Sequence, residues 1–364
     1  MRAENELILL TSAINKSESE IKRIEDILSE PVDWGYIIGQ LIHHRLTGYF
    51  MMGLPETCTK YLFKEVRKQL DLIVKLNKVL TRENMDYMQK IFDEFEKENV
   101  KYAGLKGVIF NSSLYELGMR RSNDIDILVH EADLKKIDEI LRKEGFIQAL
   151  NSDKGEASKK DKIIQRLHHH DLIPYYKKNE DFELLAYFKI DINFRIDDGK
   201  DKETLTEKVF DYGTIIYEEN GYKIRGLRWE GHLLHLCIHF SREASHSLWV
   251  SDKRDCMIYK LIDIENTIRS IGVDKLEKWI KEVSQFDCNR EIYFTLFYLN
   301  QFYPNTEYER IMEMIKTDKE GVDEIAILGT TDVVKRKRSF VESAFDLKYS
   351  IDFSNNDYKK VDLQ

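Results

Sequence analysis

The chain has 364 residues, which is enough for two domains or for one domain with a large helical addition. Its 42% hydrophobic and 33% charged residues describe a globular protein that buries a core. With 56 basic and 65 acidic residues the net charge is −9, which argues against a nucleic-acid polymer as partner. The four cysteines are scattered, and we find neither a signal peptide nor a run of about 18 apolar residues. We therefore expect a cytoplasmic protein with no membrane contact.

Residues 1–98 form an N-terminal region of helical pattern. Amphipathic spacing of apolar residues predicts helices over residues 5–28, 33–50, 60–80 and 84–98. None of these helices carries an arrangement of residues that suggests a catalytic or metal-binding site. The adjacent His43 and His44 cannot both face the same way on a helix, so we expect one buried and one exposed histidine.

The pattern changes in residues 99–228, which we take as the core of the protein. Residues 101–105 predict a short strand that ends at Lys106 and Gly107, and residues 108–117 predict a helix. A strand, a tight glycine turn and a helix start together present backbone N–H groups to an anion.

A second strand is predicted over residues 124–129, Asp-Ile-Asp-Ile-Leu-Val. Because side chains alternate along a strand, Asp124 and Asp126 share one face while the branched apolar residues enter the core. The two Cα atoms would lie about 6.5–7 Å apart, close enough for both carboxylates to bind one divalent cation. Since Asp is depleted in strands, this pair predicts a metal site.

A third carboxylate follows on a later strand. Residues 146–150 predict an edge strand, residues 151–166 an exposed polar loop, and residues 169–177 and 183–196 two further strands. In the last of these, apolar residues alternate with polar ones, and Asp191 falls on the polar face. Three carboxylates on two neighbouring strands form the cage that two Mg²⁺ ions, or Mn²⁺ ions in their place, need for phosphoryl or nucleotidyl transfer. Lys106, together with Arg120 or Arg121, would neutralise a triphosphate, and a solvent-facing position is the alternative for Arg121.

Residues 229–364 predict a C-terminal helical region. Helices are expected over residues 230–241, 252–270, 274–284 and 288–302, and the basic run 335–338 is interpreted as a solvated helix face. His235 and His239 share a helical face. Because no third ligand is evident for zinc, we favour core packing or a substrate contact for them.

Three consecutive histidines precede the polar strand. On a strand, His168, His169 and His170 would alternate faces, so they cannot together bind one metal ion. His170 is a candidate proton acceptor for an incoming hydroxyl group, and Asp191 is the other candidate for the general base.

Several of these residues together resemble a known family. Leu105-Lys106-Gly107, Tyr115, Arg120, the 124–129 strand and Glu144-Gly145-Phe146 are similar to the uncharacterised nucleotidyltransferases, which belong to the DNA polymerase β-like superfamily. The resemblance extends over most of residues 30–270. It implies an α+β fold, in which a small mixed β-sheet nucleotidyltransferase core (99–228) is embedded between helical regions 1–98 and 229–364.

The resemblance also assigns roles. Asp124, Asp126 and Asp191 match the family's three acids, Lys106 and Gly107 match its turn, and Arg120 matches its arginine. Asn193 stands where a histidine is usual in the family.

The expected activity is Mg²⁺-dependent transfer of a nucleoside monophosphate from a nucleoside triphosphate such as ATP. The acceptor would be a hydroxyl or phosphate group of a small molecule or peptide. The alternatives are a toxin-like enzyme that modifies a protein or tRNA, and a catalytically inactive nucleotide-binding module.

Overall fold

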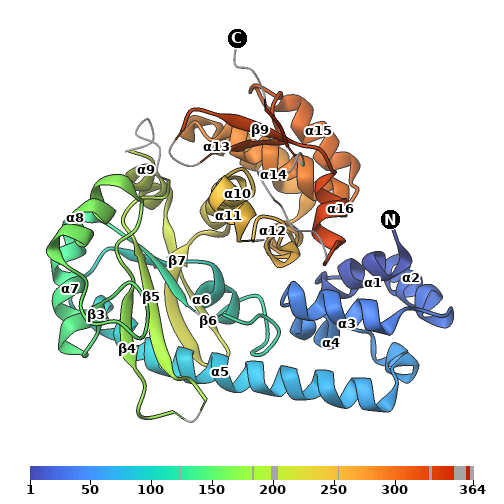
Figure 1. The fold of residues 1–364 in the computed structure, drawn as a ribbon, viewed down its shortest axis with the longest axis horizontal. Coiled ribbons are helices and arrows are strands. Elements are labelled where there is room, and N and C mark those ends of the chain that lie inside the picture. Colours follow the sequence, from blue (N-terminus) through green and yellow to red (C-terminus); the bar gives the residue numbers. More distant parts are fainter. Residues whose placement is uncertain are drawn as a thin grey trace. The chain divides into compact units, whose positions relative to one another are not determined.

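The computed structural model of the chain divides into two compact units (Figure 1). Unit 1 contains Met1–Arg67 and Leu233–Gln364, and unit 2 contains Lys68–His232. The expected core, residues 99–228, lies wholly within unit 2. The described residues are 1–122, 124–182, 184–197, 204–252, 254–327 and 330–347, together with the backbone of 358–360.

Unit 2 is built on a seven-stranded sheet whose strand order is β3-β4-β5-β2-β1-β7-β6. The strands are β1 (Tyr102–Gly104), β2 (Ile125–Val129), β3 (Ile147–Gln148), β4 (Tyr175–Lys178), β5 (Tyr187–Asn193), β6 (Thr214–Glu219) and β7 (Tyr222–Leu227). The β2–β5 and β1–β7 pairs are parallel and the other four pairs are antiparallel. The sheet is therefore mixed, and the expected α+β fold is confirmed.

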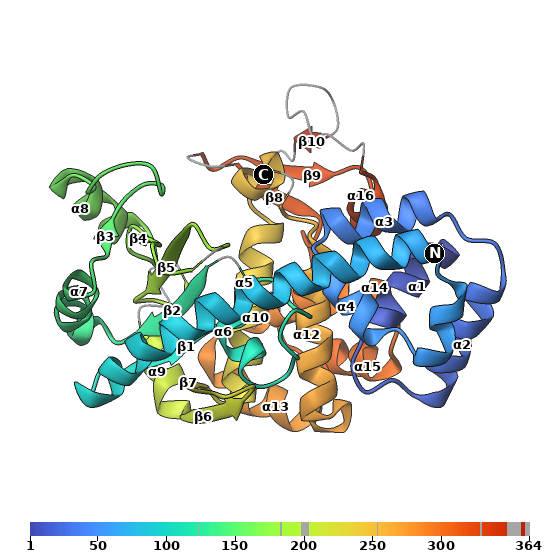
Figure 2. The same ribbon diagram turned by 90° about the horizontal axis from the view of Figure 1, so that it is seen from below.

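The core of unit 2 lies between this sheet and helices. The helix α5 (Lys64–Lys97) is one long helix in Figure 2, and its unit 2 part buries Met88, Phe92 and Phe95. The helix α7 (Leu134–Lys143) adds one apolar stripe. On β5, the alternate apolar residues are buried as their period of two predicts. Burying each such side chain contributes about 1.5–3 kcal/mol.

Several elements of unit 2 differ from the sequence-based expectation. The helix α6 (Lys106–Asn111) is six residues long and ends well before residue 117. The segment expected as a polar loop contains α8 (Lys159–His168), which Ser158 caps by accepting a hydrogen bond from the N–H of Asp161. The three histidines at its end are therefore not on a strand. The helix α9 (Leu205–Tyr212) and the β6–β7 hairpin were not predicted.

Unit 1 is mainly helical. Its helices are α1 (Ala3–Ser12), α2 (Glu18–Ser29), α3 (Trp34–His43), α4 (Thr47–Gly53), α11 (Ser247–Ser251), α12 (Ile258–Ile271), α13 (Leu276–Val283), α14 (Asn289–Phe302), α15 (Thr306–Met314) and α16 (Phe340–Phe345), with the part of α10 (Trp229–Ala244) that follows residue 232. A three-stranded antiparallel sheet has the order β10-β9-β8. Its strands are β8 (Glu324–Ala326), β9 (Val333–Arg336) and β10 (Tyr358–Lys360).

Helix boundaries in the N-terminal region differ from the prediction for local reasons. The expected helix over residues 5–28 is two helices, because Asn15 adopts a left-handed conformation (φ 48°) and Ser17 with Glu20 forms a capping box that starts α2. Arg45 (φ 58°) likewise separates α3 from α4. The helices expected over residues 60–80 and 84–98 are one helix, α5, since no glycine or proline separates them.

Two predictions about charged or titratable residues of unit 1 have opposite outcomes. His44 is fully buried and His43 is exposed, so the expectation of one buried and one exposed histidine is confirmed. The interpretation of residues 335–338 as a solvated helix face is wrong. Arg336 lies in β9 and is buried, and its guanidinium forms an ion pair of 2.7 Å with the buried Asp255.

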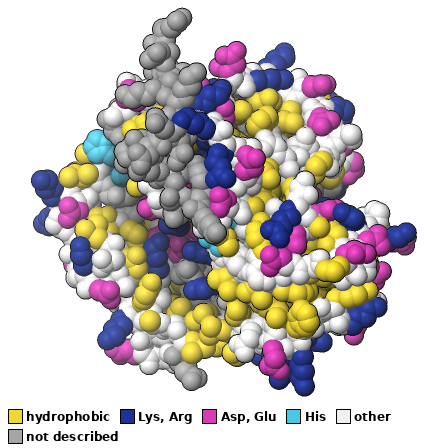
Figure 3. All heavy atoms as spheres, turned by 45° about the vertical axis from the view of Figure 1, so that its right-hand side comes forward, with side chains coloured by type: hydrophobic (Ala, Val, Ile, Leu, Met, Phe, Trp, Pro, Cys, Tyr) yellow, Lys and Arg dark blue, Asp and Glu magenta, His cyan; other side chains and the backbone are white. Residues whose placement is uncertain are grey.

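Two features bear on whether the partner is a membrane or a nucleic acid: the length and polarity of the helices, and the charges on the surface. No helix in the described ranges is both long enough and apolar enough to cross a membrane. On the face drawn in Figure 3, Lys and Arg side chains are interspersed with Asp and Glu over the described part of the surface.

Candidate functional site in unit 2

Three carboxylates gather where β2 and β5 run side by side. The two strands pair in parallel, with Asp126 directly opposite Asp191. Asp124 lies one residue before β2, and by the alternation of side chains it shares the face of Asp126. The structure therefore places the three acids near one another, as the sequence predicted.

Two lysines pair with these carboxylates. The Nζ atom of Lys106 lies 2.9 Å from Oδ1 of Asp126. The Nζ atom of Lys189 lies 2.6 Å from Oδ2 of Asp191 and 3.4 Å from Oδ2 of Asp124, so it links the first and third acids. Sequence reasoning assigned no role to Lys189. Its position two residues before Asp191 on the same strand was the signal, because such residues share a face.

The cluster shifts the pKa values of its members. Burial raises the pKa of Asp191 to about 7, and the neighbouring Asp124 and Asp126 charges add to this effect, which Lys189 opposes. Burial also acts to raise the pKa of Asp124, but the charges of Lys189 and Lys106 outweigh it, so that pKa is lowered. Burial acts to lower the pKa of Lys189, but Asp191 and Asp124 raise it above its usual value. Lys189 is therefore charged at neutral pH.

The Lys106-Gly107 turn has an unusual backbone. Lys106 adopts a left-handed conformation (φ 47°), which costs about 1–2 kcal/mol for a residue with a Cβ atom. Its backbone N–H donates a hydrogen bond of 3.0 Å to Nε2 of His232. Burial, followed by the charges of Arg120 and Lys106, lowers the pKa of the fully buried His232 to about 3, so the imidazole is neutral and can accept this bond. The sequence does not single out His232 as part of the site, because His232 lies 126 residues after Lys106.

Gly107 lies under two polar side chains. A Cβ atom built on it would lie 2.0 Å from Oγ of Ser122 and 2.7 Å from Nη1 of Arg120. The same Arg120 nitrogen donates to Ser122 Oγ at 2.9 Å, and Nδ2 of Asn111 donates to that oxygen at 3.2 Å. Arg120 is buried, and its guanidinium lies over the ring of Phe110. Only glycine allows the arginine to approach the turn this closely.

The other residues expected at the site lie as follows. The carbonyl oxygen of His170 accepts hydrogen bonds from the N–H groups of Phe194 and Arg195, which places its backbone beside the end of β5. Arg121 is exposed. His239 belongs to unit 1, where its Nε2 lies 3.5 Å from Oε1 of Glu243.

The cluster has the donor chemistry of a divalent-cation site. Carboxylate oxygens are the ligands that Mg²⁺ prefers, and the Oδ1 atom of Asp191 is buried without a hydrogen-bond partner among the described residues. Among the described residues, no group of three His, Cys, Asp or Glu side chains is arranged so that it could hold a metal ion. The ammonium group of Lys189 contacts two of the three acids, Asp124 and Asp191. The residues fit a cation beside Asp126 and the unpaired oxygen of Asp191.

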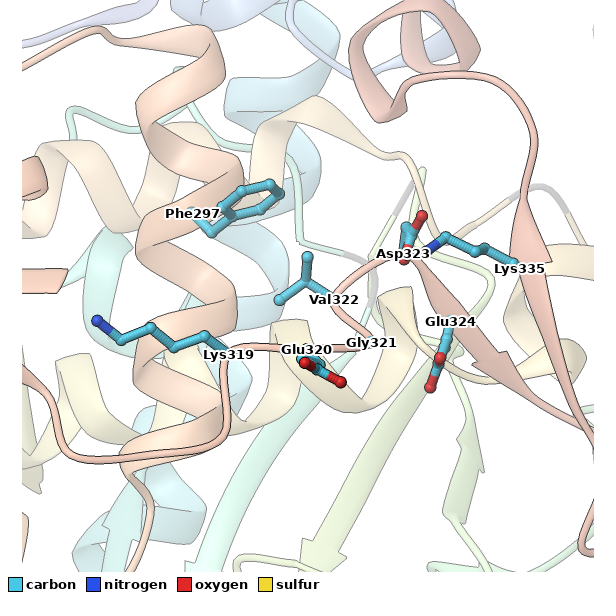
Figure 4. Close-up of a pocket in the computed structure, with 8 residues that line it drawn as sticks. All are labelled: Phe297, Lys319, Glu320, Gly321, Val322, Asp323, Glu324 and Lys335. Atoms are coloured by element: carbon cyan, nitrogen blue, oxygen red, sulfur yellow. Dashed lines mark ion pairs between the residues drawn. The ribbon is translucent and has the colours of Figure 1, made fainter. Parts of the chain in front are cut away.

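Unit 1 contains a separate pocket of about 410 Å³, shown in Figure 4. Its wall combines Phe297 of α14 with the segment before β8 and with Lys335 of β9, which forms an ion pair of 3.2 Å with Asp323. None of the residues expected at the site from the sequence lines this pocket.

Comparison with known proteins identifies the family. A family model described as uncharacterised nucleotidyltransferase matches residues 30–304. The chain belongs to this uncharacterised nucleotidyltransferase family. The resemblance inferred from the Lys-Gly turn and the Asp-x-Asp strand is thus confirmed. No curated protein and no solved structure matches the chain.

Membership in the nucleotidyltransferase family supports a transferase that uses a nucleoside triphosphate as substrate. The match includes all of unit 2 and therefore the whole carboxylate and lysine cluster.

Proposed function

We propose that the chain is a Mg²⁺-dependent nucleotidyltransferase that moves a nucleoside monophosphate from a nucleoside triphosphate to a small-molecule or peptide acceptor. The observation that carries this proposal is the register of β2 and β5, which sets Asp126 beside Asp191 in a chain of this family. Asp124, Asp126 and Asp191 would hold Mg²⁺, or Mn²⁺ in its place, and the metal would neutralise phosphate charge and stabilise the leaving oxygen.

Basic groups of the chain are suited to hold the triphosphate. Lys106 stands at the first position of α6 with its ammonium group within the acid cluster, and Arg120 covers Gly107. An arginine that is held by Ser122 and by the ring of Phe110 keeps a fixed orientation, which favours bidentate contact with a phosphate group. Arg121, which is exposed, is the further candidate for a phosphate contact.

The reaction is a displacement at the α-phosphorus. The acceptor oxygen forms a bond to the α-phosphorus, the bond from that phosphorus to the bridging oxygen breaks, and pyrophosphate leaves with the bonding electrons. When the acceptor is a hydroxyl group, its proton passes to a base of the site, for which Asp191 and His170 are the two candidates. The chain's residues thus hold the triphosphate, orient the acceptor and accept one proton.

The test is a labelling screen. The purified chain is incubated with Mg²⁺ and each of four α-labelled nucleoside triphosphates in a cell lysate, and the labelled product is identified by mass spectrometry. We expect label in a small molecule or peptide, and loss of labelling in the double variant Asp124→Ala/Asp126→Ala. Asp153→Ala, which changes an exposed carboxylate of the same unit, is the matched control and retains labelling.

The other outcomes of this screen decide between the alternatives. Label in protein or tRNA would indicate a toxin-like transferase. Nucleotide binding without pyrophosphate release, for every nucleotide and lysate fraction, would indicate an inactive binding module. Labelling that survives unchanged in the double variant would contradict the assignment of the acids.

A further inference from the structure

Lys189 links two of the three carboxylates of the cluster. Its Nζ atom is 2.6 Å from Asp191 and 3.4 Å from Asp124, and it contacts one oxygen of each. In a two-metal site for nucleotidyl transfer, one ion contacts the acceptor side and the other the triphosphate side. An acceptor-side ion held by both Asp124 and Asp191 would need the two oxygens that Lys189 contacts, Oδ2 of each acid.

We propose that the ammonium group of Lys189 takes the place of the acceptor-side metal ion, so that the loaded site holds one divalent cation. This inference rests on the proposed function and specifies how its site is built. It makes Lys189 a fixed positive charge between Asp124 and Asp191, and it leaves Asp126 and Oδ1 of Asp191 for the single cation.

The surroundings of Lys189 hold it in this position. Its side chain is 23% exposed, and it contacts both acids from within the sheet rather than from a loop. In the antiparallel pairing of β4 with β5, Tyr176 is its direct neighbour across the strands. A strand position with two anionic partners is more rigid than an isolated surface lysine.

Lys106 differs from Lys189 in its contacts. It forms an ion pair with Asp126 alone, and it belongs to the turn that would face the triphosphate. An ammonium group that must approach phosphate can leave a single carboxylate more easily than one that links two. The two lysines therefore have separate functions, Lys106 toward the phosphates and Lys189 as a constant part of the acid cluster.

The test counts bound ions without relying on turnover. Mn²⁺ is titrated into the chain in the presence of a nucleoside triphosphate analogue whose α,β bridge cannot be cleaved, and bound Mn²⁺ is counted by electron paramagnetic resonance. We expect one ion per chain for the wild type and two for Lys189→Met, which removes the ammonium group but keeps most of the side chain. Lys189→Arg, which keeps a cation, is expected to bind one ion.

Two further measurements make the result decisive. Lys178→Met, which changes an exposed lysine of the neighbouring strand β4, is the matched control and is expected to bind one ion. Thermal unfolding establishes that each variant is folded. Two ions in the wild type, or one ion in folded Lys189→Met, would overturn this inference and leave the proposed function intact. No bound Mn²⁺ in the wild type would overturn both.

Discussion

Asp126 and Asp191 are direct neighbours across the parallel pairing of β2 and β5. Parallel neighbours point to the same face of a sheet, so this single pairing brings together acids that are 65 residues apart in the chain. Lys106 reaches the cluster from the other neighbour of β2, the strand β1, since the N–H of Leu105 donates to the carbonyl oxygen of Asp126 at 3.0 Å. The arrangement of the site thus depends on backbone pairing rather than on loops.

Asp126→Asn tests this relationship. The substitution keeps the size of the side chain and removes the charge that pairs with Lys106 and that would bind Mg²⁺. We expect Mg²⁺-dependent affinity for nucleoside triphosphate, measured by isothermal titration calorimetry, to fall at least about tenfold, which corresponds to about 1.4 kcal/mol. Asp153→Asn, at an exposed position, should leave the affinity unchanged. Equal affinities in the two variants would exclude Asp126 as a ligand.

Gly107→Ala tests the close approach of Arg120 to the turn. The added methyl group would lie 2.0 Å from Ser122 Oγ and 2.8 Å from Ser122 Cβ, so the serine must move and the arginine that it holds must move with it. We expect nucleotide affinity to weaken about tenfold or more while the fold is kept, as measured by calorimetry and circular dichroism.

A second substitution separates steric from other effects of Gly107→Ala. Ser122→Gly removes Oγ and Cβ of Ser122, and the first of these is the atom that the new methyl group would meet most closely. The double variant should therefore bind nucleotide better than Gly107→Ala alone, although Ser122→Gly by itself weakens binding. A purely additive double-mutant cycle would show that the contact is not the cause.

The site could be predicted in part because its acids lie on strands with a strong local pattern. Asp-Ile-Asp and Ile-Asp-Ile-Asn each place apolar residues on one face and polar residues on the other, and the period of two is visible in the sequence. The pattern of β5 also places Lys189 on the same face as Asp191, two residues later. The pairing of Lys189 with both Asp124 and Asp191 depends on strand order, which local periodicity does not specify.

Other parts could not be predicted because they depend on distant or single-residue effects. The hydrogen bond between the N–H of Lys106 and His232 joins the first residue of α6 to α10, 126 residues later. The breaks at Asn15 and Arg45 come from left-handed backbone conformations at residues that are not glycine, and composition gives little warning of these. Four consecutive basic residues at 335–338 predict an exposed segment. Arg336 is nevertheless buried, because its ion pair with the buried Asp255 neutralises its charge.

Arg336→Met tests that buried ion pair. The variant keeps the apolar part of the side chain but leaves Asp255 buried and without its guanidinium partner. Breaking a buried pair in this way typically costs about 3–5 kcal/mol of unfolding free energy. Arg338→Met, in the same basic run, breaks an exposed pair with Asp346 and should cost no more than about 1 kcal/mol. Similar urea midpoints for the two variants would contradict the structural role of Arg336.

The buried His44 predicts a pH dependence of stability for unit 1. Its Nδ1 accepts the N–H of Ile258 and its Nε2 donates to the carbonyl oxygen of Ala344. Burial, with a smaller contribution from His43, lowers the pKa of His44 to about 3, whereas in the unfolded chain this pKa is about 6.5. Above pH 6.5 the imidazole is neutral in both states, so His44 adds no pH dependence there.

Below pH 6.5 the unfolded state binds a proton at His44 that the folded state does not. The free energy of unfolding should therefore fall by about 1.4 kcal/mol per pH unit between pH 6.5 and 3 because of this residue. His44→Gln removes that contribution, and His43→Gln, at the exposed neighbour, keeps it. Urea titrations at pH 7, 6 and 5 can follow tryptophan fluorescence, since three of the four tryptophans lie in unit 1. The same pH slope in His44→Gln and His43→Gln would contradict a neutral, buried His44.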